Sequence, residues 1–208
     1  MSDQPPKTLQ ELGEEFHLMI GECVAAWAQV DDELFRIFLE CLGAPAPQCA
    51  IIFYRLPGLD VRFNLTDEIV RSVLPPRARK QGGHDHPSVV AWTKAKQGSA
   101  KAKDRGYQHL LAVRRRIAHQ PVGIQSGPYY WNVSFLDTPP PSWFEIRVGE
   151  FERLREKEAE LPGLAIEDLR IHIRDVIALR DRLHRFYYDV LLKRHEESPL
   201  TDPPQSQG

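Results

Sequence analysis

The sequence predicts a mainly α-helical protein with a small antiparallel β meander inserted before its last long helix. The helices are predicted by apolar residues that recur every three or four positions, first over residues 8–42 and again from residue 166 onward. The meander is predicted at about 121–148, where the apolar period changes to two and the connections are rich in glycine and proline.

The composition fits one globular domain, or one domain plus an appendage. The 208 residues are 42% hydrophobic and 27% charged, which is ordinary for a protein with a sizeable core. We expect this domain to cover residues 8–195, between disordered termini at 1–7 and 196–208 that are rich in proline and polar residues. No apolar run has the length of a membrane span and the N-terminus lacks a signal-peptide pattern, so we expect a cytoplasmic protein with no membrane partner.

The first helix is expected to begin at a capping box, Thr8 followed by Glu11, and to end at Gly43. More than thirty residues is long for a globular helix, so part of its apolar seam is expected to face a partner subunit. The three cysteines, of which two lie on this helix, show no metal-ligand spacing, and we interpret them as buried, reduced thiols.

Shorter helices are expected next, separated by proline and glycine. The predicted segments are Gln48 to Leu56, Leu59 to Leu74, and a stretch through Val90 and Trp92 that is interrupted at Gly98-Ser99 and resumes up to His119. The core face of the second segment is predicted to be Leu59, Phe63, Ile69, Val70 and Val73. Trp92, which lies among lysines, belongs either to the core or to a surface that stacks a nucleic-acid base.

Three strands and two helices are expected in the remainder of the chain. The strands are Val122 to Gln125, Tyr129 to Phe135 and Trp143 to Val148. A charged helical segment, Glu150 to Leu161, precedes the last long helix, which begins at Ile166.

The segment that looks most like a site is the end of the helix before the strands. Arg114, Arg115, Arg116 and His119 are close together there, and Pro121 stops the helix near His119. With about 100° between successive residues, Arg114 falls within the apolar stripe, Arg115 and His119 at its edge, and Arg116 on the solvated side.

An arginine on a buried face needs either a counter-charge or an open cleft. Asp31, on the apolar side of the first helix, is a candidate for a structural ion pair with Arg114. The other interpretation is a binding or catalytic role, because the planar guanidinium suits a phosphate group.

Positive charge is concentrated around this helix. Residues 77–116 contain eleven Lys and Arg but two Asp and Glu, a net charge of +9, whereas the whole chain has −2 and the remainder therefore −11. A polyanion such as RNA would bind such a surface, for which Lys101, Lys103, Arg105, Arg115 and Arg116 are candidates. The alternative is a solvated lysine-rich loop. The nearby sequence His84-Asp85-His86 is too isolated to predict a metal site, and no cofactor motif is present.

The order of the predicted elements, together with Arg-x-x-x-x-His at a helix end, resembles the HEPN superfamily of small helical-bundle proteins. The residues that carry the resemblance are Arg114 and His119, supported by Trp27-Ala28-Gln29-Val30-Asp31-Asp32-Glu33-Leu34, which is similar to the Trp-x-x-Val-acid segment of bacterial members. Arg115 stands where the family usually has Asn or another small polar residue.

The resemblance implies a metal-independent endoribonuclease that works as a homodimer, in a toxin or phage-defence setting with a cognate antitoxin or partner protein. Arg114 would hold the scissile phosphate, and His119 would assist proton transfer from the ribose 2′-hydroxyl, giving 2′,3′-cyclic phosphate ends. The alternative that the resemblance leaves open is a non-catalytic RNA-binding or protein-interaction scaffold.

Overall fold

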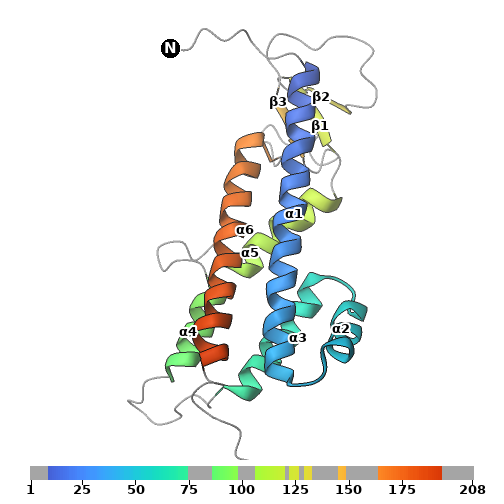
Figure 1. The fold of residues 1–208 in the computed structure, drawn as a ribbon. Coiled ribbons are helices and arrows are strands. Elements are labelled where there is room, and N and C mark those ends of the chain that lie inside the picture. The colour runs from blue at the N-terminus through green and yellow to red at the C-terminus, as the bar shows by residue number, and fades with distance from the viewer. Residues whose placement is uncertain are drawn as a thin grey trace, which may run out of the picture. The chain divides into compact units, whose positions relative to one another are not determined.

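The computed structural model describes residues 9–74, 86–97, 106–119, 122–126, 129–132, 145–148 and 164–193 of the chain, and of Leu9, His119 and the strands it describes the backbone alone. This part is mainly helical, as predicted (Figure 1). It divides into two compact units: unit 1 comprises residues up to 27 and 108–176, and unit 2 comprises 28–107 and the residues from 177 onward. The predicted domain limits, both termini and the charged segment Glu150 to Leu161 lie outside the described residues.

Helix α1 (Leu9–Leu42) is continuous over 34 residues and contributes to both units. Its end confirms the prediction, since Gly43 follows with φ of +64° and its N–H donates to the Leu39 carbonyl oxygen at 3.1 Å. Glycine suits this position because a side chain disfavours the left-handed conformation. The helix buries one face, as the apolar period predicts: Phe16, Cys23, Trp27, Val30, Leu34, Ile37 and Phe38.

Unit 2 contains α2 (Ala46–Arg55), α3 (Leu59–Val73) and α4 (Pro87–Lys96), with α2 and α3 beside the C-terminal half of α1 (Figure 1). Aromatic rings form its core: Phe38 contacts Phe53 with centroids 5.3 Å apart, and Phe63 stacks on Tyr107 at 3.6 Å. Trp92 is 2% exposed and its indole N–H donates to Asp67, so the core interpretation of this residue is confirmed. The predicted face of α3 is nearly right, but Thr66 is buried while Ile69 and Val73 are only partly buried.

Unit 1 contains α5 (Tyr107–His119) from its second residue on, and the first half of α6 (Ile166–Phe186). Its core joins three elements that are distant in sequence: Phe16 and Cys23 of α1, Ile117 of α5, and Leu169 of α6. This packing fixes the last turns of α5, where the candidate site was predicted.

Three short strands follow α5, but they do not form the predicted meander. The strands are β1 (Val122–Ser126), β2 (Tyr129–Asn132) and β3 (Glu145–Val148), in the order β2-β1-β3, all neighbours antiparallel. β3 pairs with β1, with Val122 opposite Val148, whereas a meander would pair it with β2. Alternation in the sequence predicts which segments are extended. It does not predict whether β3 pairs with β1 or with β2, because the twelve residues between β2 and β3 are too many for a tight hairpin turn.

The last helix ends in a wider turn. α6 continues into a π-helix, η4 (Tyr187–Leu192), which the apolar period did not predict. Within the described residues, none of the helices is both long enough and apolar enough to pass through a membrane.

Candidate functional site

Helix α5 carries the predicted site residues, and its apolar stripe is confirmed. Leu110, Leu111 and Ile117 are all buried, and Val113 packs against the unit 1 core. α5 ends at His119, as Pro121 predicts. Arg114 lies between Val113 and Ile117 and is partly buried.

The exposure of two neighbours of Arg114 differs from what the 100° spacing of residues around the helix predicts. Arg115, expected at the edge of the stripe, is exposed, and Arg116, expected in solvent, is partly buried. Long aliphatic stems lie along a protein surface while their charged ends stay in water, so an arginine on the polar side can lose exposure without entering the core.

Arg114 has no hydrogen bond or ion pair with another described residue in the structure. A partly buried guanidinium usually has an anionic partner, because removing its charge from water is costly. Asp31, the predicted counter-charge, forms an ion pair with Arg62 of α3. Asp31 belongs to unit 2 and Arg114 to unit 1, so their pairing stays a prediction.

His119 lies five residues after Arg114 on the same helix, which places it about 7.5 Å further along the axis. Its side chain is outside the described part, as are Lys101, Lys103 and Arg105. Strand β1 starts at Val122, so backbone hydrogen bonding to β2 and β3 begins almost directly after the helix end.

Unit 1 also contains a buried neutral pair that the sequence did not reveal. The Trp27 indole N–H donates to Nε2 of His172 at 3.0 Å, and each residue is 3% exposed. Because Nε2 accepts this bond, the ring proton of neutral His172 is on Nδ1. Burial, and secondarily the nearby His109, lowers the pKa of His172 to about 4.

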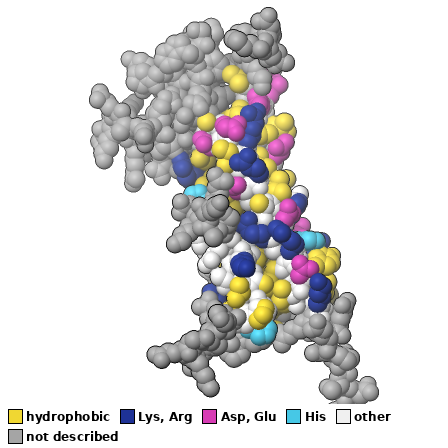
Figure 2. Space-filling view, turned by 90° about the vertical axis from the view of Figure 1, so that its left-hand side faces the viewer, with side chains coloured by type: hydrophobic (Ala, Val, Ile, Leu, Met, Phe, Trp, Pro, Cys, Tyr) yellow, Lys and Arg dark blue, Asp and Glu magenta, His cyan; other side chains and the backbone are white. Residues whose placement is uncertain are grey.

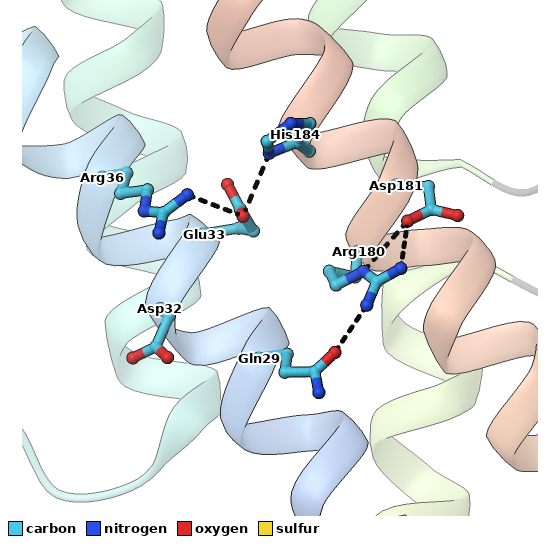
Figure 3. Close-up of a pocket in the computed structure, with 7 residues that line it drawn as sticks. All are labelled: Gln29, Asp32, Glu33, Arg36, Arg180, Asp181 and His184. Carbon is cyan, nitrogen blue, oxygen red and sulfur yellow. Dashed lines mark hydrogen bonds and ion pairs between the residues drawn. The ribbon is translucent and has the colours of Figure 1, made fainter.

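Unit 2 has a polar pocket of about 320 Å³ between α1 and the second half of α6. Figure 3 shows its side chains, which come from positions some 150 residues apart: Gln29, Asp32, Glu33, Arg36, Arg180, Asp181 and His184. Apart from the quoted Trp27-to-Leu34 segment, nothing in the sequence pointed to these residues, because they lie on the polar faces of amphipathic helices.

Charges of both signs are mixed on the face of the described residues that Figure 2 shows. Figure 2 shows Lys and Arg side chains lying among Asp and Glu side chains on one face. In the described ranges, no three His, Cys, Asp or Glu side chains are grouped as a metal ion would require. Of the sequence His84-Asp85-His86, the structure describes only His86, which caps α4 by accepting a hydrogen bond from the Ser88 N–H.

Compared with protein-family models, with curated proteins and with solved structures, the chain matches none. The HEPN resemblance therefore rests on the residues of this sequence.

Proposed function

We propose that the protein is a metal-independent endoribonuclease of HEPN type, with a helical bundle of that kind. Arg114 is the observation that carries the proposal. It is a partly buried cation without a partner among the described residues, on a helix whose neighbouring residues Val113 and Ile117 are anchored in the core. A guanidinium held in this way is preorganised for an external anion such as a phosphodiester.

The proposed reaction needs an anion holder and a proton carrier. Arg114 would stabilise the charge that develops on the phosphate oxygens. His119 would take the proton of the ribose 2′-hydroxyl as that oxygen bonds to phosphorus. The bond from phosphorus to the 5′-oxygen would break, and the departing 5′-oxygen would take a proton from the protonated histidine or from water. The products would be a 2′,3′-cyclic phosphate and a 5′-hydroxyl.

The site is proposed to be shared by two copies of the chain, so that both motifs face one cleft. Arg115, Arg116, Lys101, Lys103 and Arg105 would then contact the RNA backbone, consistent with the +9 charge of residues 77–116. Sedimentation should give a dimer at micromolar concentration, and a strictly monomeric protein would contradict the shared cleft. We further propose control by a partner protein such as an antitoxin.

Cleavage of end-labelled single-stranded RNA in EDTA tests the activity. Arg114→Ala and His119→Ala should each lower the rate by about 100-fold or more, while the fold measured by circular dichroism is kept. Matched controls are Arg174→Ala and His17→Ala, which remove an exposed arginine and an exposed histidine of unit 1 and should leave the rate unchanged.

A second substrate tests whether cleavage uses the ribose 2′-hydroxyl. RNA with a single 2′-deoxy nucleotide at the cut position should resist cleavage there, because the attacking hydroxyl is missing. Cleavage that survives Arg114→Ala would contradict the assignment. Salt-dependent RNA binding without products would instead support the non-catalytic binding scaffold.

A further inference from the structure

The pocket of unit 2 contains a carboxylate that is only half satisfied. The side chain of Glu33 is 9% exposed, and its Oε1 accepts from Nη1 of Arg36 at 3.2 Å and from Nδ1 of His184 at 3.1 Å (Figure 3). Its Oε2 is buried and has no hydrogen-bond partner. A buried charged oxygen left in this state is costly, so the site is incomplete without a further donor.

The cations of the pocket are already held by its own residues. Nε and Nη2 of Arg180 donate to Asp181, and Nη1 donates to the side-chain oxygen of Gln29 at 2.6 Å. All three guanidinium nitrogens are therefore occupied. Arg36, at the rim, is bound to Glu33.

The anions of the pocket are in excess. Asp32 lines it, is exposed, and forms no hydrogen bond or ion pair with another described residue. Three carboxylates (Asp32, Glu33 and Asp181) line the pocket against two arginines (Arg36 and Arg180), so carboxylates outnumber arginines by one. The unmatched groups are thus two acceptors, the Asp32 carboxylate and Oε2 of Glu33.

We propose that this pocket binds a small organic cation with N–H donors, a primary amine or a guanidine. Its N–H groups would donate to Asp32 and to Oε2 of Glu33, reached by a small rotation of the Glu33 carboxylate. The volume of about 320 Å³ is at the lower end of the range for small-molecule sites, which suits a short aliphatic chain.

The helix geometry next to the pocket supports a binding role. The π-helix Tyr187–Leu192 begins three residues after His184, and the rings of His184 and Tyr188 lie 4.5 Å apart. π-turns are rare and frequently occur at functional sites, because they cost hydrogen-bond geometry.

Titration calorimetry of the full chain with agmatine, which has both a primary amine and a guanidine, tests the proposal. We expect saturable 1:1 binding, weakened about tenfold by Glu33→Gln and about threefold by Asp32→Asn. Glu68→Gln, an exposed carboxylate on α3, is the matched control and should bind as the unchanged protein does.

The probe itself has controls. Tetramethylammonium is a cation, as agmatine is, but it has no N–H donors and should not bind. Equal binding of both cations, binding unaffected by Asp32→Asn, or no saturable binding of agmatine would each overturn the proposal. Asp32 is exposed, so its variant remains informative even if Glu33→Gln fails to fold. Phosphate binding with release of agmatine would also overturn it.

Discussion

The buried polar pair of unit 1, Trp27 with His172, is neutral, whereas the polar contacts of unit 2 include three ion pairs: Arg62 with Asp31, Lys96 with Asp67, and Arg36 with Glu33. In unit 1 two partly buried cations, Arg114 and Arg116, have side chains without a hydrogen bond or ion pair to another described residue, and Arg114 is the one that lies within the apolar stripe of α5. The difference separates arginines that hold the fold together from arginines that are available to a ligand.

Acid should affect unit 1 first and most strongly. In the unfolded chain His172 takes up a proton near pH 6.5, but in the folded protein its pKa is about 4. The folded state is therefore fully favoured above pH 6.5 and loses stability as the pH falls to about 4, by about 3 kcal/mol at roughly 1.4 kcal/mol per pKa unit. Urea unfolding at pH 7 and pH 4 measures this loss.

A variant isolates the histidine. His172→Gln keeps an acceptor for Trp27 but does not titrate, so the stability of this variant should change much less between pH 7 and pH 4.

In unit 2, burial acts to raise the pKa of Asp67, but hydrogen bonds from Lys96 and Trp92 and the charges of Lys96 and Arg71 hold this pKa below its ordinary value. Its contribution is present above pH 3.8 and is lost only below that. A single loss of stability below pH 4, with none between pH 6.5 and pH 4, would contradict the prediction that acid affects unit 1 before unit 2.

Removing one arginine from each unit should have unequal effects. Arg62→Met breaks a pair whose side chains are 19% and 18% exposed and should lower the free energy of unfolding by about 2 kcal/mol. Arg114→Met keeps the aliphatic stem and should change it by less than about 0.5 kcal/mol. Equal losses in denaturant titrations would show that Arg114 also has a structural partner.

A backbone comparison along α1 should give a smaller effect. Gly43→Ala should destabilise by about 1 kcal/mol, because an alanine disfavours φ of +64°. Gly21→Ala should stabilise by a similar amount, since this glycine is within the helix and nothing lies within 4 Å of an added Cβ. The two melting temperatures should move in opposite directions.

The smallest expected effect concerns the thiols. Burial, and then the charge of Glu22, raises the pKa of Cys23 to about 12, so its reactive thiolate is scarce at neutral pH. Cys41, on the same helix in unit 2, is only partly buried. Iodoacetamide should label Cys41 before Cys23, as measured by mass spectrometry of the native protein. The reverse order would indicate that unit 1 opens more readily.

Local signals in the sequence were enough to predict the described α-helices, but not the π-helix η4. Gly43 and Pro121 mark the ends of α1 and α5, and the apolar period gives the buried stripe of α1. The order β2-β1-β3 could not be predicted, because strand pairing depends on contacts between segments rather than on alternation within them.

The two candidate sites also differ in how far the sequence predicts them. Arg114 could be singled out because it interrupts an apolar stripe, which is a local anomaly. Glu33 and Arg180 could not, since charged residues on a polar helix face look ordinary until the fold brings two such faces together. Arg62 as the partner of Asp31 was missed for the same reason.

The wide turn after α6 explains how two apolar side chains that are five positions apart are both buried, Phe186 at 3% exposure and Leu191 at 3%. In an α-helix five residues correspond to a rotation of about 140°, which would send one of them to solvent, whereas hydrogen bonds from residue i to i+5 return them to the same side. The π-helix thus has one residue more between Phe186 and Leu191 than an α-helix with both side chains on the same face would have. Deleting Asp189 should let an ordinary helical turn form and still bury both Phe186 and Leu191.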